Sequence, residues 1–312
     1  MTVEVIIPNF NGSPLIAKNL PKIAGILEKV SITATISIVD DYSEMQDYLA
    51  LKEIIKKHKS KKIPISLFRN EKNLGFSSTV NKAALLSSAD YLLLLNTDVV
   101  PIGDFLSPLI EDMEEDIDLF GVGCLDESME NGKKVYRGRG VGFWKKGFFV
   151  HKKGDIEKKD TQWISGGSAL VRRTYFVELG GFDEIYNPFY WEDIDLSYRA
   201  LKKGYKLMFD KRSRVLHEHN VGSIKSTYQE ITVKTIAYRN QIIFVWKNIT
   251  DFKLLLSHFI YLPAYLIRSG IKGDSAFIIG FLMAIKRLPQ ILEKRRLQRK
   301  SFTKKDWQIL SK

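Results

Sequence analysis

The stretch "DYLLLLNTD", Asp90–Asp98, contains five consecutive apolar residues and then turns polar. The run is too short for a typical helix, and a strand that is apolar on both faces is typical of a parallel sheet covered by helices. We therefore predict a buried strand here, which ends in polar side chains. The segments on either side decide whether a whole sheet of this kind exists.

Strand-like and helix-like segments alternate along the first 125 residues. Short β-rich runs predict strands over residues 3–8, 32–40, 63–69, 90–98 and 118–124. Amphipathic segments predict helices over residues 14–29, 45–58, 76–87 and 104–115. This alternation indicates an α/β fold with a mainly parallel sheet flanked by helices. Ligands of such sheets bind at the carboxyl ends of the strands.

Polar residues stand at the carboxyl ends of three of the predicted strands. They are Pro8, Asn9 and Asn11 after the first strand, Asp40 and Asp41 after the second, and Asn96, Thr97 and Asp98 after the fourth. Each residue alone is most often an ordinary loop or cap residue. Three such groups at equivalent positions of one sheet predict a binding site.

A second polar cluster lies in "NPFYWEDIDLSYRALKKGY", Asn187–Tyr205. Glu192, Asp193 and a further acid follow three aromatic residues and open a segment with helical periodicity that ends near Gly204. Acids in a first turn interact favourably with the helix dipole, so a simple cap explains them as well as a site does. A carboxylate beside aromatic surface also loses hydration, which raises its pKa.

The composition is that of a globular protein, and its charge is unevenly distributed along the chain. The 312 residues are 45% hydrophobic and carry a formal net charge of +12. Residues 286–312 hold ten Lys or Arg and two acids, a local charge of +8, which suits anionic lipid head groups, nucleic acid or simple solubility. Cys124 is the only cysteine and lies in an apolar run, so we expect a buried thiol. No secretory signal is visible, and a cytoplasmic location is expected.

The remaining segments differ from this pattern. Residues 126–162 have weak periodicity and predict a hairpin or loop; their "RGRGVGFWKKG" does not open a helix, which excludes a dinucleotide motif.

Beyond about residue 225 only helices are expected, with apolar runs of 14 and 11 residues separated by Lys272 and Asp274, and the first run is interrupted by Pro263. A membrane span needs about 20 residues. The region is predicted to lie in the plane of a membrane surface, or to serve as a lid or dimer contact.

The polar residues suggest one chemistry. Asp98 at a strand end suits Mg²⁺ or Mn²⁺, with phosphate oxygens completing the shell, and His217 is a further candidate ligand, although a lone His is often structural. A metal there would neutralise a diphosphate leaving group. Asp40 or Asp41 is placed to bind a nucleobase or ribose. Asp193, desolvated by Trp191 and its neighbours, is the candidate general base, and Glu192 is placed to bind acceptor hydroxyls.

Seven segments in order give the chain a family resemblance. They are "VIIPNFNG", "IVDDYS", "RNEKNLGFSSTVNKA", "LLLLNTDV", "WISGGSALVRRTYFVELGGFDE", "FYWEDIDLSYRALKKGY" and "VLHEHNVGS". The set resembles the family 2 glycosyltransferases with a GT-A fold, and within them the bacterial rhamnosyl- and galactofuranosyl-type enzymes of cell-surface polysaccharide synthesis. The resemblance covers roughly residues 3–225. It implies an inverting transfer from a nucleotide sugar by one in-line displacement.

Individual roles follow from the resemblance. It implies nucleoside binding by Pro8, Asn9, Asp40 and Asp41, a donor-contacting loop at Arg69, Asn73 and Gly75, and a turn beneath the sugar at Gly166 and Gly167. Asn96–Asp98 stands where the family has Asp-x-Asp, with Asp98 as the metal-binding acid; Asn96 leaves one charge fewer for the ion. The resemblance also implies Asp193 as base, Glu192 and Trp191 at the acceptor, and His217 at the metal or diphosphate.

We therefore predict that the protein is a metal-dependent glycosyltransferase. Residues 1–225 are predicted as the catalytic domain and residues 226–312 as a helical, apolar and basic region. The expected partners are a nucleoside diphosphate sugar and a glycan or lipid-linked glycan at the inner face of the cell membrane. No nucleic acid partner is expected, and a homo-oligomer is left open. The alternatives are a nucleotidyltransferase, for which the loop after the first strand lacks a basic residue, and a non-catalytic nucleotide-sugar or polyanion binder.

Overall fold

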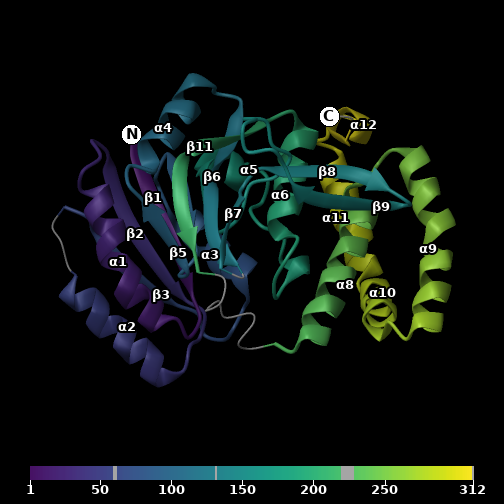
Figure 1. Ribbon diagram of the computed structural model, residues 1–312, viewed down its shortest axis with the longest axis horizontal. Coiled ribbons are helices and arrows are strands. Elements are labelled where there is room, and N and C mark those ends of the chain that lie inside the picture. Colours follow the sequence, from purple (N-terminus) through teal and green to yellow (C-terminus); the bar gives the residue numbers. More distant parts are fainter. Residues whose placement is uncertain (59–61, 131, 219–227, 311–312) are drawn as a thin grey trace.

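A computed structural model describes residues 1–58, 62–130, 132–218 and 228–310 (Figure 1). One large sheet runs through the molecule in the order β3-β2-β1-β4-β10-β6-β11-β5, and β7 pairs with β6. A separate hairpin pairs β8 with β9. The strands are β1 (Thr2–Asn9), β2 (Thr33–Asp40), β3 (Ile65–Arg69), β4 (Tyr91–Leu95), β5 (Val99–Ile102), β6 (Leu119–Glu130), β7 (Lys133–Arg137), β8 (Gly140–Lys145), β9 (Phe148–Lys153), β10 (Ser168–Arg172) and β11 (Lys206–His217).

Helices cover both faces of the sheet and form the C-terminal end of the chain. They are α1 (Ser13–Leu27), α2 (Met45–Lys57), α3 (Phe76–Leu86), α4 (Leu106–Glu115), α5 (Arg173–Glu178), α6 (Glu192–Lys203), α8 (Glu230–Asn248), α9 (Phe252–Lys272), α10 (Ser275–Lys286), α11 (Leu288–Arg299) and α12 (Asp306–Leu310), with a short 3₁₀ helix η1 (Glu184–Tyr186). The predicted alternation over the first 125 residues is confirmed.

Side chains alternate in direction along each strand, so the apolar core is divided between the two faces of the sheet. Val3, Val5 and Ile7 of β1 pack with apolar residues of α1, α2 and α4 on one face. Ile6 points the other way and packs with residues of α3, α5 and α6. Successive side chains of a strand point to opposite faces, so a fully apolar strand has to be covered on both sides. Cys124 lies in the first of these clusters, buried as predicted.

The sheet is parallel throughout its N-terminal half and mixed beyond it, where β11 pairs in parallel with β6. Strands β1 to β4 pair in parallel, whereas β10 runs antiparallel between β4 and β6, and β5 runs antiparallel to β11. The predicted α/β class is confirmed, and the sheet as a whole is mixed. The difference arises because residues 126–172 return to the sheet through a hairpin and an extended segment, without the crossover helix that a parallel neighbour needs.

The segment 126–162 forms strands, as the hairpin prediction required. Strand β6 continues to Glu130 and pairs with β7, and β8 pairs with β9 over Gly140–Lys145 and Phe148–Lys153. Gly140 is required for this arrangement, because a Cβ atom there would lie 2.0 Å from Nε1 of Trp163. The tip of the β8–β9 hairpin reaches the C-terminal helices (Figure 1).

The C-terminal helices share an aromatic core with the hairpin and α6. Phe149 of β9, Trp191 and Tyr198 beside and in α6, and Phe244 of α8 form this cluster. Pro263 was expected to interrupt an apolar run, but it lies inside α9, which extends over 21 residues. Pro263 is exposed, so water can satisfy the carbonyl whose helical partner it removes.

One described helix, α9, is long and apolar enough to cross a membrane, and the bent pair α10 and α11 passes the same test if it is counted as one segment. Within the most apolar 18-residue segment of α9, only 17% is buried in the protein. The predicted domain boundary after residue 225 lies outside the described residues.

Candidate active site

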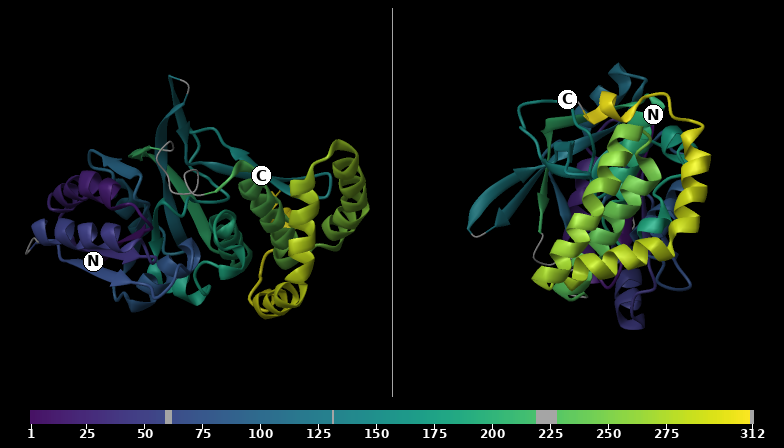
Figure 2. Two further views of the ribbon diagram at one scale, coloured as in Figure 1. Left: turned by 90° about the horizontal axis from the view of Figure 1, so that it is seen from below. Right: turned by 90° about the vertical axis from the view of Figure 1, so that its right-hand side faces the viewer.

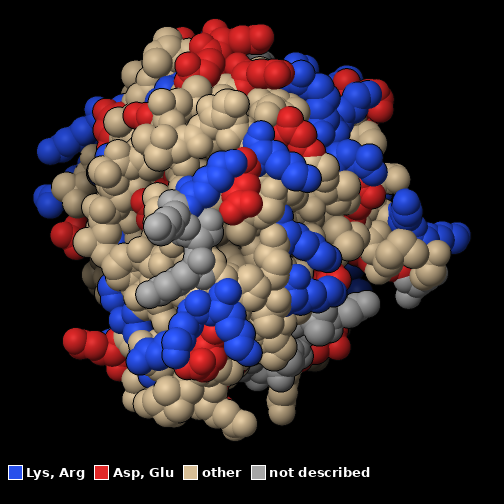
Figure 3. Space-filling view, turned by 90° about the vertical axis from the view of Figure 1, so that its left-hand side faces the viewer, with Lys and Arg blue, Asp and Glu red and all other residues tan. Residues whose placement is uncertain are grey.

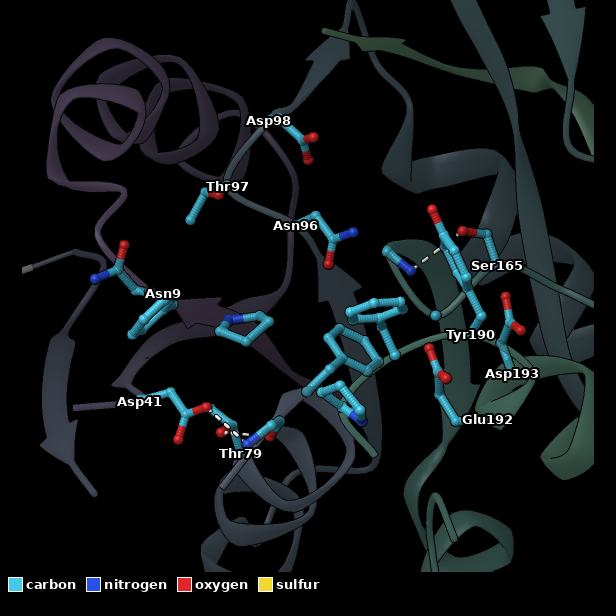
Figure 4. Close-up of a pocket in the computed structure, with 18 of the residues that line it drawn as sticks. Asn9, Asp41, Thr79, Asn96, Thr97, Asp98, Ser165, Tyr190, Glu192 and Asp193 are labelled. Carbon is cyan, nitrogen blue, oxygen red and sulfur yellow. Dashed lines mark hydrogen bonds between the residues drawn. The ribbon is translucent and has the colours of Figure 1, made fainter. Parts of the chain in front are cut away.

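A cavity of about 420 Å³ opens at the carboxyl ends of β1, β2 and β4 (Figure 4). Most of the predicted site residues line it: Pro8, Asn9, Asp41, Asn73, Gly75, Asn96, Thr97, Asp98, Gly166, Gly167, Glu192, Asp193 and His217. Figure 4 shows Asn9, Asp41 and Asp98 on one side of the hollow and Glu192 and Asp193 on the other. The strand ends and the acidic cluster therefore share one cavity.

Two predicted residues, Asp40 and Arg69, contact each other outside the cavity lining. The carboxylate of Asp40 is fully buried, accepts a hydrogen bond from Nδ2 of Asn9 at 3.0 Å, and lies 3.3 Å from Nε of Arg69. Arg69 also donates to the carbonyl of Ser43 at 2.8 Å. Neither Asp40 nor Arg69 lines the cavity. Their contacts brace the two loops that follow β1 and β2.

Asn11 and Trp191 also lie outside the cavity lining. Asn11 is exposed; its N–H donates to Oγ of Ser43 at 2.8 Å and its side-chain oxygen accepts from the N–H of Glu44 at 2.9 Å. Trp191 is only 7% exposed and packs its ring on Phe149 and Phe244. Asn11 therefore joins two loops, and Trp191 anchors the start of α6 in the aromatic core.

Asp41 organises the loop that carries Asn73. Its carboxylate accepts hydrogen bonds from Nδ2 of Asn70 and from the N–H groups of Leu74 and Gly75, each at 2.8 Å. Gly75 has φ of 84°, a conformation that favours glycine, and it is the N-cap residue of α3. The predicted donor loop is thus fixed to the end of β2.

A strained turn aims the two candidate catalytic acids into the cavity. Tyr190 and Trp191 both have positive φ, 69° and 76°, a conformation that costs about 1–3 kcal/mol for each non-glycine residue. Asn240 of α8 stabilises this turn, because its Nδ2 lies within hydrogen-bond distance of the carbonyls of Tyr190 at 2.8 Å and of Phe189 at 3.0 Å. Asn240 is fully buried. The C-terminal helices therefore hold the turn that presents the acids of α6.

Both acids at the start of α6 have raised pKa values. Burial, together with the negative charge of Asp193, raises the pKa of Glu192 to about 8. Burial raises the pKa of Asp193 to about 6, although its carboxylate accepts a hydrogen bond from the N–H of Ile194 at 2.7 Å. Of the two carboxyl groups, Asp193 is therefore the first to lose its proton as pH rises. Paired carboxyl groups with separated pKa values are the usual arrangement for acid and base roles.

Asp98 faces His217 across a short gap. Nε2 of His217 lies 3.4 Å from Oδ2 of Asp98, and its Nδ1 lies 2.7 Å from Oδ2 of Asp126. Burial alone would lower the pKa of His217, but the hydrogen bonds to Asp126 and Asp98 outweigh it and raise this pKa to about 9. The register of β6 and β11 produces the contact, since Asp126 pairs with Val215. The second histidine of "HEH", His219, lies outside the described residues.

The glycine pair allows a close approach to the end of β4. A Cβ atom on Gly167 would lie 2.3 Å from Nδ2 of Asn96. The N–H of Asn96 donates to the carbonyl of Gly167 at 3.0 Å, and the N–H of Gly167 donates to Oγ of Ser165 at 3.2 Å. Gly167 therefore holds Asn96 in place, and both glycines line the cavity.

Several lining residues were not predicted. They are Phe10, Phe76, Thr79, Ser165, Pro188, Phe189, Tyr190 and Tyr228. Most of them are apolar or aromatic, and nothing in the sequence separates such residues from core positions. Among the residues that the structure describes, no Lys or Arg lines the cavity. The one basic group at the cavity within those residues is His217.

Known proteins resemble the chain over different lengths. A stretch of 62 residues is 44% identical to an N-acetylglucosaminyl-diphospho-decaprenol L-rhamnosyltransferase of Mycobacterium tuberculosis, covering 19% of this chain and 20% of that protein. Over 225 residues the chain is 25% identical to the O-antigen chain rhamnosyltransferase RfbN of Salmonella typhimurium, covering 70% of this chain and 67% of the relative. The alignment with the mycobacterial protein thus spans about a fifth of its length.

Solved glycosyltransferase structures share the fold at low sequence identity. The S. aureus TarS 1–349 complex with UDP-GlcNAc has a TM-score of 0.62 at 14% identity and matches 96% of this chain and 87% of that one. GalNAc-T7 with UDP, GalNAc and Mn²⁺ has a TM-score of 0.63 at 18% identity and matches 79% of this chain and 48% of the other. The predicted GT-A class, with its C-terminal helical region, is confirmed.

The family assignment comes from the sequence itself. Residues 4–180 match glycosyl transferase family 2, and this region includes the strand ends, the donor loop and the glycine pair described above. The match covers more than half of the chain. The protein is a member of glycosyl transferase family 2.

Proposed function

We propose that the protein transfers one sugar from a nucleoside diphosphate sugar to a hydroxyl group of a glycan or lipid-linked glycan, with inversion at the anomeric carbon, in cell-surface polysaccharide synthesis. One observation carries the proposal: Asp98 at a strand end and Asp193 on α6 line the same cavity, although 95 positions separate them. A metal-binding acid and a base on opposite sides of one hollow suit a displacement at the carbon between them.

The donor would lie along the strand ends. Pro8, Asn9 and Asp41 line the part of the cavity nearest β1 and β2, where a nucleoside fits. Within the described residues, Oδ1 of Asp41 accepts hydrogen bonds from Asn70 and Leu74, whereas Oδ2 accepts one from Gly75 alone, so Oδ2 keeps a lone pair for a ribose hydroxyl or base N–H. Asn73 and Thr97 line the cavity between the nucleoside and the diphosphate positions in this arrangement.

A divalent ion fits beside Asp98 and His217. Two ligands at right angles around Mg²⁺ lie about 3 Å apart, close to the 3.4 Å between Oδ2 of Asp98 and Nε2 of His217. Asp126 on the other nitrogen of His217 matches the carboxylate that commonly orients a metal-binding histidine. No cluster of three His, Cys, Asp or Glu able to hold a metal occurs within the described residues, so donor phosphates would complete the shell. Mg²⁺ or Mn²⁺ would neutralise charge on the leaving diphosphate.

Replacing Asp126 by Asn is expected to weaken Mn²⁺ binding by about 10–100-fold, because the imidazole of His217 loses the carboxylate that orients it. Calorimetry of Mn²⁺ in the presence of a nucleoside diphosphate measures this affinity directly. Glu127→Gln is the matched control, since Glu127 follows on the same strand but pairs with Arg214. Equal Mn²⁺ affinity in the Asp126 variant and the control would remove His217 from the proposed metal site.

The acceptor hydroxyl would approach from the side of α6. Asp193 would take its proton as the oxygen attacks, and the protonated carboxyl of Glu192 would donate a hydrogen bond to an acceptor oxygen. Gly166 and Gly167 line the cavity, and Gly167 packs closely on Asn96, so the sugar would lie against this glycine pair. One displacement with a base opposite the leaving group inverts the configuration.

The proposed setting is the cytoplasmic face of the cell membrane. The mycobacterial relative is named for an acceptor with a diphospho-decaprenol lipid, and the C-terminal helices of this chain expose apolar surface. We propose residues 1–225 as the catalytic domain and residues 226–312 as the part that contacts the membrane.

A panel of nucleoside diphosphate sugars tests the function. One donor is expected to raise the melting temperature only when Mn²⁺ or Mg²⁺ is present, and to be hydrolysed slowly or transferred to added acceptor. Release of pyrophosphate from a nucleoside triphosphate and a sugar phosphate would instead show a nucleotidyltransferase. Stabilisation by every donor without any turnover would show a binding protein.

A further inference from the structure

Helix α9 exposes one continuous apolar face, which we call the α9 stripe and define as Phe252, Leu256, Phe259, Ile260, Ile267 and Ile271. The spacing of these residues places them on one side of a helix. Their exposed fractions reach 76% at Phe252 and 82% at Ile271. A large contiguous apolar patch on a protein surface marks an interaction site.

The opposite side of α9 is fixed to the protein. His258 is fully buried; its Nδ1 lies 2.7 Å from the carbonyl of Gly147 at the hairpin tip, and its Nε2 accepts from Nε1 of Trp246 at 2.9 Å. Leu262 and Ser269 are buried on the same side. A transmembrane orientation would break these contacts and place His258 in lipid. The stripe is therefore suited to lie flat on a surface.

The next helix, α10, also exposes apolar residues. Ile279, Leu282 and Ile285 of α10 are 46%, 58% and 42% exposed. Figure 2 shows α9, α10 and α11 together on the face seen in its right-hand view. This face is at the opposite end of the molecule from α1 and α2 (Figure 1). Several helices thus contribute to one end face.

A second cavity, of about 270 Å³, opens between the β8–β9 hairpin, α8, α9 and α10, and α9 lines it with the side that carries Ser269, not with the stripe. Lys145, Arg268 and Lys272 line it, against one acid, Asp274, and we call these three cations the basic pocket. Within the described chain, none of the three forms an ion pair with an acid. Three unpaired cations around a small cavity suit a phosphate group.

We propose that the α9 stripe and the basic pocket together dock the protein on an anionic phospholipid bilayer, with a lipid phosphate bound in the basic pocket. Arg268 precedes the stripe residue Ile271 by three positions, so it borders the apolar face, and Lys272 is the neighbour of Arg268 one turn further along the helix. Apolar residues flanked by Lys and Arg are typical of helices that lie in the plane of an anionic membrane. The local charge of +8 over residues 286–312 adds attraction to the same lipids.

Charge favours a bilayer over a second copy of the chain. A two-fold contact through this face would place the same patch against itself. The basic pocket of one copy would then approach that of the other, and like charges repel. Anionic headgroups neutralise the same cations.

The docking face is linked to the active site by the β8–β9 hairpin. Phe148 lines the cavity of the basic pocket, and the next residue, Phe149, packs on Trp191 with ring centroids 6.0 Å apart. Glu192, which lines the catalytic cavity, follows Trp191. The inference rests on the proposed function for its setting, since a lipid-linked acceptor would be presented at this surface.

Co-sedimentation with lipid vesicles tests the proposal on the full chain. The protein is expected to bind vesicles of equimolar phosphatidylcholine and phosphatidylglycerol, to bind phosphatidylcholine vesicles much less, and to lose binding as salt is added. Each basic residue near an anionic surface contributes about a fivefold factor, so Lys145→Gln/Arg268→Gln/Lys272→Gln is expected to lower the partition coefficient on the order of a hundredfold.

A matched control removes the same charge elsewhere. Lys22→Gln/Lys56→Gln/Lys57→Gln alters three exposed lysines of α1 and α2, on the end where basic and acidic side chains are interspersed (Figure 3). This control is expected to bind as the wild type does. Equal loss in both triple variants would overturn the basic pocket and leave only an effect of net charge. A separate variant, Ile260→Asp/Ile267→Asp, is expected to abolish binding through the stripe, with circular dichroism confirming the fold.

Other occupants of the face give different results. Wild-type protein that sediments as a dimer and becomes a monomer in Ile260→Asp/Ile267→Asp, with vesicle binding unchanged, would overturn the proposal in favour of a dimer contact. Resistance to alkaline carbonate extraction from cells would overturn it in favour of a spanning helix. Slow donor hydrolysis needs no membrane, so its persistence in variants that fail to bind vesicles separates this inference from the proposed function.

Discussion

Replacing Asp193 by Asn is expected to lower kcat by a factor of about 10²–10⁴, the usual contribution of a general base. Asn has the same size, and its amide oxygen can still accept the N–H of Ile194, which lies 2.7 Å from Oδ1 of Asp193. The variant therefore keeps the geometry and loses only the proton acceptor. Steady-state transfer at saturating donor measures the change. Donor affinity is expected to stay the same, because Asp41 and Asp98 are untouched.

Glu192→Gln is the control for this experiment. Burial and the charge of Asp193 raise the pKa of Glu192 to about 8, so its carboxyl is neutral at pH 7, as a glutamine amide is. The substitution is expected to change kcat by less than about tenfold. A larger loss in Glu192→Gln than in Asp193→Asn would assign the base to Glu192 and contradict the proposed roles.

The pH dependence is a second readout of the same assignment. A base works in its charged form, and burial raises the pKa of Asp193 to about 6. Wild-type kcat is therefore expected to rise about tenfold between about pH 5 and pH 7, as Asp193 loses its proton. Asp193→Asn is expected to remove this rise. A wild-type profile that is flat over this range would argue against Asp193.

The strand ends of the site were predictable from local patterns. Alternating segments place the carboxyl ends of parallel strands at one edge, so Asn9, Asp41 and Asp98 were expected together, and all three line the cavity. The sequence could not predict that Asp41 lines the cavity while Asp40 does not. The two are neighbours at the end of β2, where side chains alternate in direction, and only the contacts of Asp40 with Asn9 and Arg69 show which one points away from the cavity.

Long-range contacts account for the rest of what the sequence did not predict. Asn240 stabilises the turn at Tyr190 from a helix 50 positions away, and Asp126 reaches His217 through the pairing of β6 with β11. Neither residue belongs to a local pattern, because each acts through a neighbour in space. Pro263 was misjudged for a related reason: its effect on a helix depends on whether water reaches the carbonyl left unpaired.

Replacing Lys247 by Met is expected to lower the free energy of unfolding by about 3–5 kcal/mol, the usual cost of removing one partner from a buried ion pair. Nζ of Lys247 lies 2.8 Å from Oδ1 of Asp195 and also contacts Asp183, and both Lys247 and Asp195 are fully buried. Arg199 holds the other oxygen of Asp195 at 2.7 Å. The substitution leaves two carboxylates with too little positive charge at the contact between α6 and α8. Urea unfolding measures the loss.

Lys234→Met on the same helix is the matched control, because Lys234 is exposed and surface changes usually alter stability by less than about 0.5 kcal/mol.

The pH dependence of the stability difference between wild type and Lys247→Met is a further check. Burial alone would raise the pKa of Asp195, but Lys247 and Arg199 outweigh it and lower this pKa in the folded protein. The stabilisation is thus present above the ordinary aspartate pKa and is lost as pH falls through the lowered value. The gap between wild type and Lys247→Met is therefore expected to narrow in acid, since protonation removes the uncompensated charge in the variant. A gap of the same size at every pH would mean that Met fits the space poorly, and would remove the ion pair as the cause.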